Sequence, residues 1–192
     1  MAITGVGWEL ELVRLGQHQG PALIRTYGSY AVYLNNQAIS ELSGFIVECQ
    51  GPGENDRVCD ENYRRRIRED TYPLYTHDTH YASIDYSKAA TRPTDEHPMP
   101  GFGLCLKPGD ARSGILIHPA HDGGLFLASI GCLNPTGPLQ RHDDMDIDDS
   151  RQRVIDLLES LKAHDSAAFA DRGTRRIGGA TIVISGEPLN FL

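Results

Sequence analysis

The sequence predicts a mostly β (α+β) fold with one main C-terminal helix, formed as a single domain over residues 1–192. Short segments in which apolar and polar residues alternate recur along the chain, as in half-buried strands. Twenty glycines and eleven prolines supply many turns between these segments. Only one segment has apolar residues at helical spacing. With 40% hydrophobic residues, the chain is long enough to bury a core.

The N-terminal half predicts four strand segments. Trp8–Gly16 alternates as a strand does, and Gly20–Ser40 predicts an edge strand and a hairpin with its turn at Asn35–Asn36. Glu41–Gly53 predicts a strand that ends at a Gly-Pro-Gly break, and Ile67–His77 predicts another.

The middle of the chain predicts a long surface loop from Asp85 to Asp110, because prolines recur there and apolar runs are short. A short strand, Phe102–Leu106, is expected within it. Ile115–Ile117 is a continuous apolar run, which is typical of a buried strand.

One segment predicts a helix, from Ser150 to Phe169. Asp149 is its expected N-cap, with Gln152 completing a capping box, and Gly173 lies just past its expected end. Ala180–Gly186 predicts a final strand. The apolar residues that share one helical face are Val154, Ile155, Leu158 and Leu161.

Charge and hydropathy exclude several functional classes. The chain has 18 Lys and Arg against 26 Asp and Glu, a net charge of −8, and its basic runs, such as Arg64–Arg66, are short. We therefore expect no nucleic-acid partner. No apolar run is long enough to cross a membrane, so no membrane insertion is expected. The N-terminus does not resemble a signal peptide, which predicts synthesis in the cytoplasm.

The four cysteines, at positions 49, 59, 105 and 132, contain no Cys-x-x-Cys pair, which disfavours a structural zinc site. A Cys49–Cys59 bridge is conceivable in an oxidising compartment. Cys105 alternates with apolar neighbours and is expected in the core. We expect no metal and no cofactor.

A histidine and a cysteine stand out after the Ile115–Ile117 run. His118 ends the run, and Cys132 follows fourteen residues later, behind Ser129 and Gly131. A cysteine nucleophile needs an imidazole to take its proton and donors for the oxyanion, and the Gly131 and Cys132 N–H groups are candidates. Ser129 would fix the turn or bond near the thiolate. On spacing alone, a histidine at the end of a strand and a buried cysteine explain the pattern better than a catalytic pair does.

These residues resemble the L,D-transpeptidase catalytic domain, which carries Ile-His followed by Ser-x-Gly-Cys. Here Ile117-His118 and Ser129-x-Gly131-Cys132 supply both motifs, and Thr71–Pro73 lies where the family has an upstream strand. The similarity spans residues 45–138. A branch of phage- or secretion-associated proteins resembles this sequence more closely still.

The resemblance implies an L,D-transpeptidase-like β-sandwich or barrel and a cysteine acyltransferase that acts on peptidoglycan stem peptides. Cys132 would be the nucleophile and His118 the base, while Ser129 and Gly131 shape the site. A thioester to the stem would release D-alanine, and an amine, a D-amino acid or water would resolve it. The expected substrate-binding residues are Asn134, which takes the place of the family's usual arginine, Tyr72 and His121.

Peptidoglycan lies outside the cytoplasm, so the resemblance implies delivery. A type VI secretion effector that acts in the periplasm of a target cell would need no signal of its own, and phage lysis is the other route. An effector toxin also implies an immunity protein as a partner.

Two alternatives stay open. A zinc-dependent peptidoglycan hydrolase could use His118 and His121 with His142, or the cluster of His77 and His80. However, His118 and His121 run into a glycine-containing loop rather than a helix. The second alternative is a non-catalytic phage or cell-wall-binding module that keeps the fold.

Overall fold

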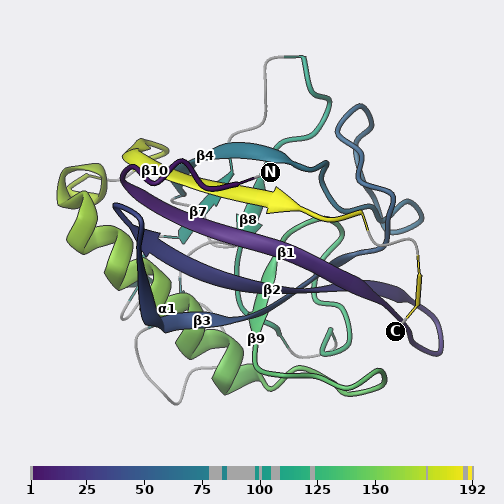
Figure 1. Ribbon diagram of the computed structural model, residues 1–192. Helices are drawn as coiled ribbons and strands as arrows, with labels where there is room; N and C mark the ends of the chain where they lie inside the picture. Colours follow the sequence, from purple (N-terminus) through teal and green to yellow (C-terminus); the bar gives the residue numbers. More distant parts are fainter. Residues whose placement is uncertain are drawn as a thin grey trace.

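The computed structural model describes residues 2–77, 84–85, 98–99, 101–104, 109–121, 124–171, 173–187 and 190–191, and it shows one large curved sheet with a helix beside it (Figure 1). The elements, in chain order, are β1 (Trp8–Gln19), β2 (Ile24–Leu34), β3 (Gln37–Cys49), β4 (Asp70–His77), β5 (Ile84–Asp85), β6 (Pro98–Met99), β7 (Gly101–Leu104), β8 (Ile115–Ile117), β9 (Asn134–Thr136), α1 (Ile147–His164), the 3₁₀ helix η1 (Ser166–Phe169) and β10 (Arg176–Ser185).

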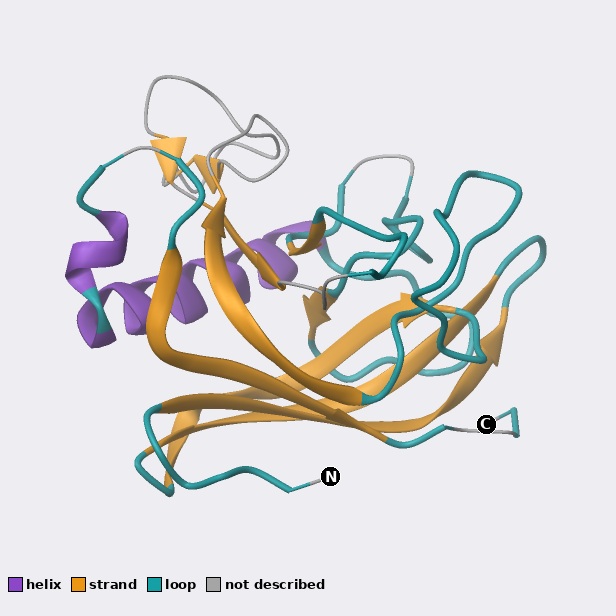
Figure 2. Cartoon of the chain, turned by 90° about the horizontal axis from the view of Figure 1, so that it is seen from above, coloured by secondary structure: helices purple, strands orange, loops and turns teal. Residues whose placement is uncertain are grey.

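The large sheet is a nearly closed barrel, which confirms the predicted mostly β fold with a single main helix. Its strand order is β8-β7-β4-β10-β1-β2-β3-β9, and β5 and β6 pair separately. The two edge strands meet where Ile117 of β8 bridges Leu133, the residue just before β9. We call this bridge and the residues beside it, 116–118 and 132–134, the seam. Most of the longer loops gather beyond one end of the sheet (Figure 2).

The hairpin between β2 and β3 confirms the predicted turn. Asn35 and Asn36 have φ angles of 49° and 66°, and they join Leu34 to its partner Gln37. Two successive left-handed residues match the twist of the strands, and asparagine tolerates this conformation. The prediction that this segment is an edge strand is wrong, because β2 bonds to β1 on one side and to β3 on the other.

The helix α1 lies beside the sheet and packs its apolar face against it. Its apolar face joins the main core with Trp8 and the inward residues of β1, β2, β4 and β10. The helical residues in this core are the four predicted ones, Val154, Ile155, Leu158 and Leu161, together with Leu157. The helical face was therefore predicted correctly.

The predicted ends of this helix are wrong. The N-cap is Asp146, whose carboxylate accepts a bond of 2.8 Å from the Asp149 N–H, so Asp149 lies inside the first turn. Met145, just before the N-cap, is buried, so the helix begins about one turn earlier than predicted. Asp165 breaks the helix after His164 and caps η1 instead, so Gly173 ends neither element.

Other boundaries shift in ways that pairing explains. β1 and β10 are longer than predicted, because each strand continues along its neighbours beyond its own apolar run. β9 was not predicted, since Pro135 lies within it. β7 and β8 confirm two short predicted strands. Cys105 and most of the predicted loop from Asp85 to Asp110 lie outside the described residues.

A buried serine holds the two sides of the seam together. The Ser150 hydroxyl, in the first turn of α1, donates to the Pro135 carbonyl in β9 at 2.5 Å and accepts from the Ala120 N–H at 2.9 Å. Ala120 lies two residues after His118. The helix therefore fixes both chain segments that form the seam.

We predict that Ser150→Ala lowers the free energy of unfolding by about 1–3 kcal/mol, because it leaves a buried N–H and a buried C=O without their shared partner. Urea denaturation followed by circular dichroism measures this change. Gln152→Ala, on the exposed side of the same helix, is the matched control and should change stability by less than about 0.5 kcal/mol. Equal stability of the two variants would contradict the role of Ser150.

Candidate active site

The seam places His118 and Cys132 on two hydrogen-bonded chain segments. The Leu133 N–H donates to the Leu116 carbonyl at 2.9 Å, and the His118 N–H donates to the Leu133 carbonyl at 3.1 Å. Ile117 and Leu133 both point into the core. Because side chains alternate along extended chain, the β-carbons of the neighbours His118 and Cys132 lie on the other side of the bridge. His118 is not among the residues that line the cavity beside Cys132.

The sulfur of Cys132 takes a backbone place in this ladder. In a regular parallel ladder, the Leu116 N–H would next bond the carbonyl of Gly131. Instead it donates to the Cys132 sulfur at 3.3 Å, and the thiol in turn contacts the Gly114 carbonyl at 3.6 Å. Among the described residues, no hydrogen bond joins the thiol to the His118 ring. At the edge of β8, the Cys132 sulfur therefore takes the place of the Gly131 carbonyl as the acceptor for the Leu116 N–H.

The displaced Gly131 carbonyl faces Arg112, a residue that sequence reasoning missed. Arg112 is 5% exposed, and one guanidinium nitrogen donates to the carbonyls of Glu54 and Arg66 at 2.7 and 2.9 Å. The other lies 3.4 Å from the Gly131 carbonyl. Arg112 thus ties the loop between Glu54 and Arg66 to the cysteine turn. No pattern near Cys132 could have indicated it, since the two are twenty residues apart.

Gly131 is required by space rather than by backbone conformation. Its φ is not positive, so its backbone conformation is open to other residues. A β-carbon at this position would lie 2.2 Å from a guanidinium nitrogen of Arg112. Only glycine lets that cation pack directly against the turn.

Ser129 fixes the turn that carries the cysteine. Its hydroxyl donates to the Cys132 carbonyl at 2.9 Å, and its own carbonyl accepts a contact of 3.4 Å from the Cys49 thiol. The N–H groups of Gly131 and Cys132 donate to no other group within the described part of the chain. These two N–H groups therefore have no acceptor in the described structure, and Gly131 is buried.

His118 is held as a neutral imidazole. Its Nδ1 lies 2.8 Å from the Pro119 carbonyl, which can only accept, so Nδ1 carries the proton and Nε2 has the lone pair. Burial lowers the pKa of His118 to about 4. Asn134 is fully buried behind it and donates to the His118 carbonyl at 2.9 Å, while the Asn134 Oδ1 is buried without a partner in the described structure. The structure thus places Asn134 against the base and not at the surface.

The Cys132 thiol is also neutral at rest. Burial raises its pKa, although the Leu116 N–H and the Arg112 cation both act to lower it. The side chain is nevertheless half-buried, and the thiol lines a cavity of about 150 Å³. The walls of this cavity are Val58 and Cys59, residues 111–115 and residues 130–132.

The two other predicted substrate residues lie apart from this cavity. Tyr72 is 1% exposed, and its hydroxyl donates to the Arg68 carbonyl and accepts from Asn55, so the structure places it in the core. His121 is exposed, and its Nε2 donates to the Ala128 carbonyl at 2.9 Å. It lies close enough to His118 for its charge to help lower the pKa of that ring.

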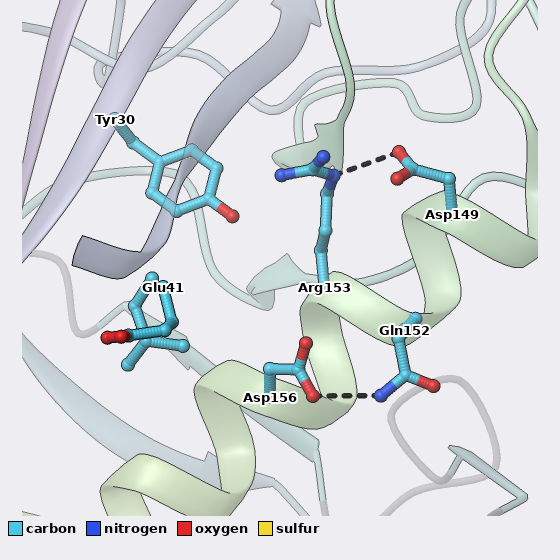
Figure 3. A pocket seen from close by; sticks show the side chains of 7 residues that line it. Tyr30, Glu41, Asp149, Gln152, Arg153 and Asp156 are labelled. Atoms are coloured by element: carbon cyan, nitrogen blue, oxygen red, sulfur yellow. Dashed lines mark hydrogen bonds and ion pairs between the residues drawn. The ribbon is translucent and has the colours of Figure 1, made fainter. Parts of the chain in front are cut away.

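Two other site hypotheses can be compared with the structure. Cys49 and Cys59 are both free, so no bridge joins them. Among the described residues, which leave out Asp78 and His80, no three His, Cys, Asp or Glu side chains gather as a metal site. Between the β2–β3 hairpin and α1 lies a second cavity of about 160 Å³, where Arg153 bonds Asp149 at 2.9 Å (Figure 3). Neither a cysteine nor a histidine lines it.

We predict that Gly131→Ala destabilises the protein by about 1–3 kcal/mol, because the added methyl group displaces Arg112 from its three carbonyls. Arg112→Ala should also destabilise it. The clash is absent in the double variant, so its loss of stability should be smaller than the sum of the losses in the two single variants. Urea denaturation of the four proteins measures this coupling. Strict additivity would show that the guanidinium does not pack on Gly131.

We predict that stability falls as the pH is lowered from about 6.5 to about 4. Burial lowers the pKa of both His18 and His118 from 6.5 to about 4, so the unfolded chain binds more protons in that window. Each ring contributes about 1–3 kcal/mol. Thermal melts across this range should be flatter for His118→Gln, whereas His142→Gln, at an exposed ring, should melt as the parent does. If the parent, His118→Gln and His142→Gln lost stability in parallel as the pH falls, His118 would not be buried as a neutral ring.

No family model, curated protein or solved structure matches this chain. Within the described part of the chain, no helix is both long and apolar enough to pass through a membrane. The chemistry of the site is therefore the basis for a functional assignment.

Proposed function

We propose that the protein is a cysteine acyltransferase that acts on peptidoglycan stem peptides, as an L,D-transpeptidase, an L,D-carboxypeptidase or a D-amino-acid exchange enzyme. The observation that carries this proposal is the seam, where the residues that bear a cavity-lining thiol and a neutral imidazole lie on two hydrogen-bonded chain segments. The motifs Ile117-His118 and Ser129-x-Gly131-Cys132, which resemble those of L,D-transpeptidases, supply the substrate class.

In the proposed reaction, His118 is the general base. Its Nδ1–H bond to Pro119 leaves Nε2 unprotonated, and a pKa of about 4 keeps it so at neutral pH. The Cys132 thiol must first break its contact with the Gly114 carbonyl, which is weak because it is 3.6 Å long. The thiol must then turn toward the His118 ring. Catalytic hydrogen bonds of this kind commonly tighten only when substrate is bound.

The next steps follow from the turn. The thiol proton moves to Nε2 while the sulfur attacks the stem-peptide carbonyl carbon, and the resulting oxyanion accepts from the free N–H groups of Gly131 and Cys132. The C–N bond then breaks, and the leaving amine takes the proton from the imidazolium. The thioester on Cys132 is finally attacked by an amine, a D-amino acid or water.

The substrate lies outside the cytoplasm, so the proposal places the reaction in the periplasm of a target cell. Delivery as a type VI secretion effector, or release by phage lysis, would bring the protein there. A producing cell then needs an immunity protein that covers the cavity beside Cys132.

We predict that Cys132→Ala lowers the formation of new muropeptides from purified sacculi by about a thousandfold or more, because the nucleophile is lost. His118→Gln should lower it by about a hundredfold or more. Liquid chromatography with mass spectrometry of digested sacculi measures the products. Cys59→Ser, which removes the other thiol of the same cavity, is the matched control and should retain activity.

Inhibitors separate the proposal from its alternatives. Iodoacetamide should abolish the activity, while EDTA should leave it unchanged. The reverse pattern would indicate a zinc hydrolase. Binding to sacculi that persists in Cys132→Ala, with no change in muropeptides for either protein, would indicate a cell-wall-binding module and refute the proposal.

A further inference from the structure

Two free thiols from distant parts of the chain face the same cavity. Cys132 lies at the seam, and Cys59 lies on the loop between Glu54 and Arg66 that forms the opposite wall. Both side chains are half-buried, so small reagents can reach them. The proposed acyl transfer uses only one of the two.

The loop that carries Cys59 is held at its base and near its tip, but the Cys59 sulfur itself is weakly held. The Glu54 N–H donates to the Arg66 carbonyl at 3.0 Å, and Arg112 binds the carbonyls of the same two residues. Near the tip, the Tyr63 hydroxyl binds the Glu54 carboxylate. Within the described residues, the one hydrogen bond of the Cys59 thiol is a long contact of 3.7 Å with the Arg65 carbonyl, so a change of the side-chain rotamer is enough to release the sulfur into the cavity.

We propose that Cys59 and Cys132 form a reversible disulfide when the protein meets a peroxide, and that this bond locks the site. The Cys59 thiol releases its proton and the sulfur attacks hydrogen peroxide. The O–O bond breaks, a sulfenic acid forms on Cys59, and the departing hydroxide takes up a proton to leave as one water. The Cys132 sulfur then attacks the Cys59 sulfur. The S–O bond breaks, and the departing hydroxide takes the Cys132 proton to form a second water.

The third described cysteine is the wrong partner for this chemistry. Cys49 is 0% exposed, it lies behind Ser129, and burial raises the pKa of its thiol to about 12. Cys59 lines the same cavity as Cys132 and Cys49 does not, although Cys59 lies near enough to Cys49 to help raise the pKa of its thiol. The bond would remove the nucleophile and narrow the cavity until a thiol reductant restores both.

The test is a mass measurement on the protein itself. Treatment with a small excess of hydrogen peroxide should remove two hydrogens from the intact mass, and a non-reducing digest should contain the peptide of Cys59 joined to that of Cys132. Dithiothreitol should reverse both changes. In Cys132→Ala, dimedone should trap the sulfenic acid on Cys59. In Cys59→Ser, no joined peptide should form.

The outcomes that would overturn the inference are specific. They are a joined peptide that contains Cys49 or Cys105, or oxidation of Cys132 to a sulfinic acid at the same rate in the parent and in Cys59→Ser. The inference rests on the proposed nucleophile. However, its readout does not involve sacculi, so a protein that forms the disulfide without altering muropeptides would refute the proposed function alone.

Discussion

The short hydrogen-bonded contact of Leu133 with β8 is the constraint on which the rest of the structure depends. Two backbone bonds, of 2.9 and 3.1 Å, join the last strand of the sheet to the first and close the barrel. So short a ladder cannot by itself offset the entropy of ordering the loop between its two sides. Ser150 binds both sides from the helix, and the buried Arg25 donates to the carbonyls of Phe126, Gln140 and Asp143 beyond it. The seam is stable because distant elements hold the loop that it closes.

Closing the sheet in this way also creates the candidate chemistry. A longer ladder would have continued with the Gly131 carbonyl opposite the Leu116 N–H, and the cysteine would then point away from a fully bonded edge. Arg112 draws that carbonyl away, and the absence of a β-carbon at Gly131 makes room for the guanidinium. The thiol moves into the vacated place. One cation thus sets the position of the thiol, leaves two N–H groups unbonded and anchors the Cys59 loop.

The sequence could predict what local patterns determine. The Asn35–Asn36 turn and the apolar face of α1 depend on residues a few positions apart, and both were predicted correctly. The N-cap was misplaced because Asp146 and Asp149 carry the same side chain, and the burial of Met145 decides between them. The His118–Cys132 pair could be proposed from its motif. Arg112, Ser150 and the inward position of Asn134 could not, since each depends on which strands meet at the seam.

The resting protonation states of Cys132 and His118 follow from the burial of both side chains. It raises the pKa of the Cys132 thiol and lowers that of the His118 imidazole, so moving a proton between them at rest would create an ion pair in a poorly solvated place. The transfer becomes favourable only when a carbonyl carbon accepts the sulfur electrons and its oxygen meets the Gly131 and Cys132 N–H groups. Such a thiol reacts slowly with solutes that bring no carbonyl. The half-buried Cys59, which lines the same cavity, would then be the first sulfur to react with an oxidant.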